Sequence, residues 1–289
     1  MHDVTRRELI AATAAALGSM VLPRSAGASG PDLAFGLGTV TYNVPKDWDL
    51  ATLLRILPQA GLHALEFRTT HAHGVEVDLS PTRRADVRSR CADAGLKQLS
   101  LGTVCEFHSP DAAVVRRNVD DCREWVRLAH DIGALGVKVR PNGLLKEVPV
   151  ERTLEQIGTA LRECGVAARD HGVEIWVEVH GAGTQQPAHM RTIMDHCGDP
   201  GVGINWNSNP TDVHEGSVRA SFDLLKPFLL SVHINDLDSG YPYGELFALL
   251  RDSRFARYTL IEVAAPVPPE QGLAFYEGYR RRWLALARG

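Results

Sequence analysis

The sequence predicts an α/β protein that folds as a single (β/α)8 TIM barrel. Eight short β-rich runs alternate with helical patterns, their starts lie 28 to 38 residues apart, and no linker or low-complexity segment interrupts them. A doubly wound open sheet is the alternative. It is disfavoured because no glycine fingerprint follows the first run and because such sheets rarely reach eight even units.

The β-rich runs predict eight strands, at residues 35–41, 64–68, 98–103, 136–140, 174–178, 203–207, 231–234 and 259–263. Helical stripes lie between them. Apolar residues follow the helical period after the third run (Val115, Val119, Cys122, Val126 and Ala129) and after the fourth (Leu154, Ile157, Leu161 and Cys164). Residues 33–286 are therefore expected to form the barrel.

The first 28 residues are typical of a twin-arginine export signal rather than of a folded element. Residues 5–10 (TRRELI) hold the arginine pair, residues 9–22 are apolar, and Ala26-Gly27-Ala28 is a cleavage pattern. The apolar run is short for a bilayer span, so no membrane span is expected after cleavage. We expect a periplasmic or secreted protein.

Composition excludes several function classes. Without residues 1–28, which hold three arginines and two acidic residues, the net charge is −5, which gives no electrostatic footprint for nucleic acid. The five cysteines are odd in number and have no C-x-x-C spacing, which favours neither a zinc ribbon nor a disulfide framework. They are Cys91, Cys105, Cys122, Cys164 and Cys197.

Strand alternation places polar side chains inside the predicted barrel. In the fifth strand Ile175 and Val177 face the helices, which leaves Glu178 pointing inward. The same reasoning turns further polar residues inward or places them at the strand ends: Glu66, Arg68, Glu106, His108, Lys138, Arg140, His180, Asn207, His233 and Glu262. Barrel enzymes keep their active sites at these carboxyl ends, and burying so many ionisable groups is costly unless they serve a ligand or one another.

Four of these residues end the last four strands and favour a metal site. Glu178, Asn207, His233 and Glu262 offer two carboxylates, an imidazole and an amide oxygen, a donor set that suits Mn²⁺ or Mg²⁺, with Zn²⁺ or Co²⁺ as further options. The competing interpretation is a self-satisfied salt-bridge network, for example Glu66 with Arg68 or with Lys138.

The chain resembles the xylose isomerase-like TIM-barrel family, also called sugar phosphate isomerases/epimerases. The motifs that carry the resemblance are LEFR at 65–68, EVHG at 178–181, VHIND at 232–236 and IE at 261–262. The resemblance implies a metal held by Glu, Asp, His and Glu from strands five to eight, which corresponds here to Glu178, Asn207, His233 and Glu262. Asn207 departs from the usual Asp and brings no charge. Asp212 and His214 follow closely and are candidates to complete the site.

The chemistry that the resemblance implies is proton transfer next to a carbonyl through an enediolate, with Glu178 and Glu262 as the acid/base pair. The expected activity is a metal-dependent sugar isomerase or epimerase, or a related lyase. Substrate contacts are expected from Glu66, Arg68, Glu106, His108, Lys138, Arg140, His180, Asp212 and His214.

The expected partner is a small carbohydrate. Export, and the lack of a phosphate-cradling glycine-rich turn after the seventh strand, favour a free sugar, a keto-glycoside or a polyol over a sugar phosphate. Two alternatives from other classes remain: a catalytically silent sugar-binding barrel with a degenerate metal site, and a nuclease like the apurinic endonucleases of this fold, which the acidic charge disfavours. The oligomeric state is open, a homodimer included.

Overall fold

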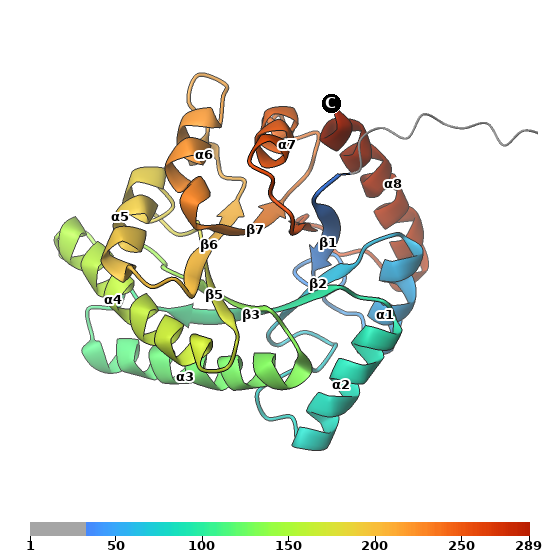
Figure 1. Cartoon of the computed structure of the whole chain (residues 1–289), viewed down its shortest axis with the longest axis horizontal. Helices are drawn as coiled ribbons and strands as arrows, with labels where there is room; N and C mark the ends of the chain where they lie inside the picture. The colour runs from blue at the N-terminus through green and yellow to red at the C-terminus, as the bar shows by residue number, and fades with distance from the viewer. Residues whose placement is uncertain (1–32) are drawn as a thin grey trace, which may run out of the picture. The chain divides into compact units, whose positions relative to one another are not determined.

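The computed structural model describes residues 33–289, and its core is a closed barrel of eight parallel strands in sequence order (Figure 1). The strands are β1 (Gly36–Val40), β2 (Ala64–Arg68), β3 (Gln98–Glu106), β4 (Gly136–Arg140), β5 (Glu174–Glu178), β6 (Val202–Asn207), β7 (Leu229–Ile234) and β8 (Tyr258–Ile261). Parallel pairing of β1 with β8 closes the ring. The predicted fold class is confirmed, and the open sheet is excluded.

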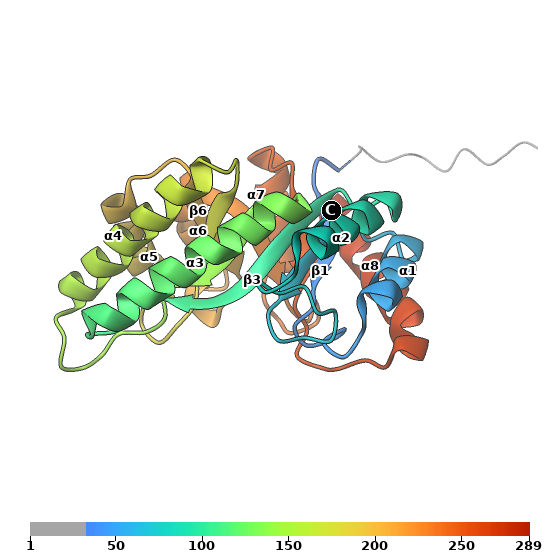
Figure 2. The same ribbon diagram turned by 90° about the horizontal axis from the view of Figure 1, so that it is seen from below.

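Eight α-helices surround the barrel (Figure 1): α1 (Leu50–Gln59), α2 (Pro81–Asp93), α3 (Ala112–Ile132), α4 (Val150–Arg169), α5 (Pro187–Cys197), α6 (Arg219–Leu225), α7 (Tyr243–Asp252) and α8 (Pro269–Arg288). Figure 2 shows α3 and α4 lying along the outside of the strands. Two 3-10 turns, η1 (Pro210–Asp212) and η2 (Lys226–Phe228), complete the order.

Local sequence explains where several helices begin and end. The Asp49 side chain accepts a hydrogen bond from the Thr52 amide at 2.8 Å, and Asp111 does the same for Ala113 at the start of α3. Gly133 ends α3 in the left-handed conformation, with φ of 75°. The two N-caps end the β1–α1 and β3–α3 loops at the rim of the barrel, and Gly133 begins the α3–β4 connection at the opposite end.

The barrel interior changes character along its axis. Val40, Ala64 and Leu260 form a small apolar cluster inside the ring, separate from the main core between strands and helices. Gly136 leaves room for the Trp176 ring, because a Cβ at Gly136 would lie 2.3 Å from that ring. Buried polar side chains, among them Glu66, Lys138, Glu178 and His233, lie near the carboxyl ends of their strands.

Most strand boundaries agree with the sequence prediction within two residues, and β3 is the exception because it runs three residues further, to Glu106. The pairing of β3 with β4 shifts register between Gly102 and Glu106 and resumes where Glu106 meets Arg140. The predicted export signal at 1–28 lies outside the described residues. Among the helices of residues 33–289, none has the length and apolarity needed to cross a membrane.

Candidate active site

The carboxyl ends of β5 to β8 bring four predicted residues together. Glu178, Asn207 and His233 lie at or near the ends of β5, β6 and β7, and Glu262 follows β8 directly. In a closed parallel barrel these ends meet at one face, and Asn207 lies opposite His233 in the strand register.

Three of these side chains form a compact group that suits a divalent cation. Glu178, His233 and Glu262 each offer a ligand atom, and the three atoms lie within 4.8 Å of one another. His233 Nδ1 is 3.3 Å from Glu262 Oε2 and 3.9 Å from Glu178 Oε1, yet it makes no hydrogen bond although it is fully buried. The imidazole nitrogen of His233 and the carboxylate oxygens of Glu178 and Glu262 together are ligand types that such a cation binds.

The opposite nitrogen of the His233 ring faces Glu66. His233 Nε2 lies 3.4 Å from Glu66 Oε2, and the Ser100 hydroxyl also donates to Glu66 at 3.4 Å. Burial opposes the charged imidazolium, but Glu262 and Glu66 outweigh it and raise the pKa of His233 to about 10. The ring is protonated in the metal-free site, and a bound cation would displace the proton on Nδ1. Glu66 therefore fixes the orientation of the ring and directs Nδ1 toward Glu178 and Glu262.

Both oxygens of Glu178 are already engaged. Lys138 Nζ donates to Oε2 at 2.7 Å, and Asn207 Nδ2 donates to Oε1 at 3.2 Å. The Lys138 and Glu178 side chains are each about 95 % buried. Burial alone would raise the pKa of Glu178, but Lys138, His233 and His180 together outweigh it and lower this pKa to about 2. Glu178 is therefore a permanently ionised carboxylate at neutral pH.

A second network lies at the rim. Arg140 pairs with Glu106 at 2.5 Å, Asn142 Nδ2 donates to Glu106 Oε1 at 2.8 Å, and His180 Nδ1 lies 2.7 Å from Asn142 Oδ1. The network joins the ends of β3, β4 and β5 and holds Arg140 and His180 at the opening of the site.

These groups surround a cavity of about 90 Å³, lined by Tyr42, Glu66, Arg68, Lys138, Arg140, Glu178, His180 and Glu262. Seven of the eight were predicted from the sequence. Tyr42 and the rim residue Asn142 were not. Asn142 follows β4 in the turn Pro141-Asn142-Gly143 with φ of 84°, a conformation in which Asn is enriched, so this turn motif was an available signal.

Six predicted residues lie outside this cavity lining. Three of them, Asn207, His233 and Glu106, still contact residues of the lining, whereas the other three lie further away. His108 is half-buried beyond the end of β3, and His214 is exposed on the loop after η1. Asp212 is fully buried and accepts hydrogen bonds from the Asn209 amide at 2.7 Å and the Tyr241 hydroxyl at 3.1 Å. In this structure Asp212 holds the β6–α6 loop together.

The environment of Asp212 predicts a pH dependence of stability. Burial raises the pKa of Asp212 to about 7, and its Oδ1 has no hydrogen-bond partner. The pKa of Asp212 is higher in the folded than in the unfolded protein. The free energy of unfolding should therefore fall as the pH rises from about 4 to 7, by at most about 1.4 kcal/mol per pH unit. Urea unfolding at several pH values should show this slope in the wild type and its absence in Asp212→Asn. Parallel curves for the two proteins would contradict it.

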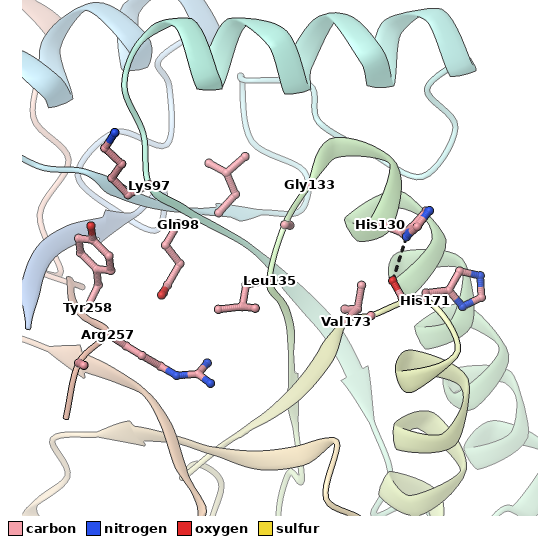
Figure 3. A pocket seen from close by; sticks show the side chains of 13 residues that line it. Lys97, Gln98, His130, Gly133, Leu135, His171, Val173, Arg257 and Tyr258 are labelled. Carbon is pink, nitrogen blue, oxygen red and sulfur yellow. Dashed lines mark hydrogen bonds between the residues drawn. The ribbon is translucent and has the colours of Figure 1, made fainter. Parts of the chain in front are cut away.

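A larger cavity, of about 600 Å³, lies at the opposite end of the barrel (Figure 3). Its lining residues precede or begin the strands, among them Gln98, Leu135 and Tyr258. Arg257, which points into it, is paired with both oxygens of Glu174 at 2.6 and 2.8 Å. Because barrel enzymes place their chemistry at the carboxyl ends of the strands, the smaller acidic cavity is the candidate active site.

Solved structures similar to this chain share its fold at low sequence identity. An L-ribulose 3-epimerase matches with a TM-score of 0.72 and 17% identity, covering 88% of this chain and 96% of that one. A D-psicose 3-epimerase matches with a TM-score of 0.67, 15% identity and the same two coverages. A 3-keto-D-glucoside 4-epimerase from E. coli matches with a TM-score of 0.68 and 14% identity, covering 86% of this chain and 99% of that one. No curated protein matches the sequence.

A match to a protein-family model shows which family this chain belongs to. The model described as "Xylose isomerase-like TIM barrel" matches residues 54–278, which include every strand from β2 to β8 and all the residues around the acidic cavity except Tyr42. The chain belongs to the xylose isomerase-like TIM-barrel family.

Proposed function

We propose that the protein is a divalent-metal-dependent isomerase or epimerase that acts on a sugar or keto-sugar through an enediolate. The observation that carries this proposal is His233 Nδ1, which is buried without a hydrogen-bond partner between the carboxylates of Glu178 and Glu262. The same nitrogen faces Glu262 Oε2 at 3.3 Å and Glu178 Oε1 at 3.9 Å, so the three groups could share one cation.

Glu178, His233 and Glu262 would hold the cation, with the amide oxygen of Asn207 as a fourth ligand once the amide turns from Glu178. Mn²⁺ or Mg²⁺ suits this set best, and Zn²⁺ or Co²⁺ is compatible with it. When bound, the cation would stabilise negative charge on adjacent substrate oxygens.

The chain's own residues would move the proton. Glu262 borders the cavity, and its side chain is about 16 % exposed, so it can reach a substrate C–H bond. Glu178 has a carboxylate oxygen within 4.8 Å of one from Glu262 and is kept ionised with the help of Lys138. Two carboxylates on opposite sides of a substrate can remove a proton from one face and return it to the other, which is what epimerisation requires.

The fold neighbours support a carbohydrate substrate because their names include a ribulose epimerase, a psicose epimerase and a keto-glucoside epimerase. Another neighbour is described as a probable 3-DHS dehydratase, which supports lyase chemistry as a variant of the same site. With the twin-arginine pattern at the N-terminus, we propose that this enzyme works outside the cytoplasm on an unphosphorylated compound.

A second candidate is a sugar-binding barrel without catalysis. It is favoured by one observation, the engagement of both Glu178 oxygens by Lys138 and Asn207, which leaves this ligand occupied. Such a protein would be stabilised by sugars without turning them over.

Metal content and proton exchange test the proposed function. We expect about one equivalent of metal in the purified protein, its removal by a chelator, and deuterium uptake at a substrate carbon in D2O. Glu262→Gln should slow this exchange by about 10²- to 10⁴-fold, because it removes a carboxylate that exchanges the proton. Glu277→Gln, on an exposed part of α8, is the control and should exchange at the wild-type rate. Sugar-induced stabilisation without exchange in any tested sugar would favour the binding protein.

A further inference from the structure

Three permanent cations border the acidic cavity, and one of them lacks a carboxylate partner. Lys138 pairs with Glu178, and Arg140 pairs with Glu106. Within residues 33–289, no carboxylate oxygen lies within 4.0 Å of the Arg68 guanidinium, whose Nη1 donates only to the Thr69 carbonyl at 3.1 Å. Most donors of Arg68 therefore remain free at the cavity.

The surroundings of Arg68 oppose its charge. The side chain is half-buried, and burial followed by the nearby charge of Arg140 lowers its pKa by more than Glu66 and Glu178 raise it. Arg140 also has an unused donor, since its Nε is buried without a hydrogen-bond partner. Two guanidinium groups thus share one small cavity, and each has an N–H group without an acceptor.

Aromatic contacts hold Arg68 in this place. Its guanidinium carbon lies 6.0 Å from the centre of the Tyr42 ring, and that ring stacks on His71 with an interplanar angle of 8°. Tyr42 is 44 % exposed at the opening of the cavity. The arginine is therefore positioned before any ligand binds, which lowers the entropic cost of using it.

We propose that the substrate carries a carboxylate, that this group binds at Arg68 beside Arg140, and that the substrate class is therefore a sugar acid. This inference rests on the proposed function, which it narrows from sugars in general to acidic sugars. A half-buried cation without a partner is costly, and a substrate anion would remove that cost.

A carboxylate fits these donors better than a phosphate does. The planar guanidinium fork matches the two oxygens of a carboxylate, and Glu106 already pairs with Arg140 in this structure. Phosphate sites in proteins commonly add backbone N–H groups at a helix N-terminus, whereas here the free donors belong to side chains.

Matched pairs of probes test the proposal by calorimetric titration: D-galacturonate against D-galactose, D-glucuronate against D-glucose, and D-gluconate against D-sorbitol. We expect at least one acid to bind ten-fold or more tightly than its neutral partner. In the wild type this preference should weaken as NaCl is raised from 50 to 500 mM, because salt screens the charges. Arg68→Met should reduce the preference to less than three-fold and should remove its dependence on salt. Arg68→Lys, which keeps the charge but not the fork, should retain part of it.

The control is Arg90→Met. Arg90 lies in the last turn of α2, is about 37 % exposed and pairs with Asp86 at 3.6 Å. The Arg90→Met variant should retain the full wild-type preference for the acid over its neutral partner. The proposal is wrong if no acid binds more tightly than its neutral partner, or if D-galactose 6-phosphate binds more tightly than D-galacturonate.

The outcomes also separate this inference from the proposed function. Deuterium exchange on neutral sugars, without any preference for acids, would retain the isomerase and refute the sugar-acid substrate. Acid binding that depends on Arg68, without exchange in any compound, would retain the carboxylate site and refute the isomerase.

Discussion

Replacing Glu178 with glutamine is expected to destabilise the protein by about 3–5 kcal/mol and to abolish metal binding. The Lys138 ammonium and the Glu178 carboxylate are 2.7 Å apart and nearly fully buried. Glutamine keeps the shape of the side chain but removes its charge, which leaves a buried ammonium without its nearest counter-charge. Urea unfolding measures the first effect, and metal analysis of the purified variant measures the second.

Two companion variants separate the causes. Glu178→Gln combined with Lys138→Met should recover most of the stability, because neither charge is then buried alone, but it should still bind no metal. Glu106→Gln removes a carboxylate from a similar pair that is about one quarter exposed, and it should cost about 1 kcal/mol or less. If Glu178→Gln unfolds like the wild type, then Lys138 has moved to Glu66 or Glu262.

The same pair predicts an acid-sensitive step. The folded pKa of Glu178, about 2, lies below its ordinary value of 4.5. This ion pair therefore stabilises the protein fully above about pH 5 and loses its contribution as the pH falls through 2. The wild type should lose stability in this range more steeply than the double variant.

The fold was predictable because the chain repeats one local pattern eight times. In β5, Ile175 and Val177 pack outward against helices, so the alternation alone indicated that Glu178 points inward. The register shift that extends β3 to Glu106 was not predictable, because it depends on how β3 meets β4 rather than on the β3 sequence.

The residues of the site were more predictable than their partners. Alternation indicates the side of a strand but not which neighbour a charged group selects. Glu66 was considered as a partner of Arg68 or Lys138, whereas it faces His233, and Lys138 instead pairs with Glu178. Burial does not indicate this choice either, because the Glu66 side chain is as buried as that of Glu178. Tyr42 reaches the cavity from a loop, to which no strand period applies.

Lys138→Met should increase the affinity of the site for Mn²⁺ by at least ten-fold. In the wild type the ammonium neutralises Glu178 and repels any second cation beside it. Two unit charges 4 Å apart interact by about 4 kcal/mol at an effective dielectric constant of 20, and a divalent ion doubles this. Only part of that energy needs to be relieved for a ten-fold change, which corresponds to about 1.4 kcal/mol.

Without metal, the Lys138→Met variant should be less stable than the wild type, since Glu178 then has no ammonium partner. Mn²⁺ should therefore raise its melting temperature more than that of the wild type, because binding restores the missing counter-charge. Lys97→Met, an exposed lysine at the opposite end of the barrel, is the control and should change neither quantity. Equal Mn²⁺ affinities for the wild type and Lys138→Met would mean that Lys138 leaves Glu178 at no cost when metal binds. Binding by the variant alone would mean that Lys138 occupies the cation's place in the natural protein, which would favour the sugar-binding barrel over the isomerase.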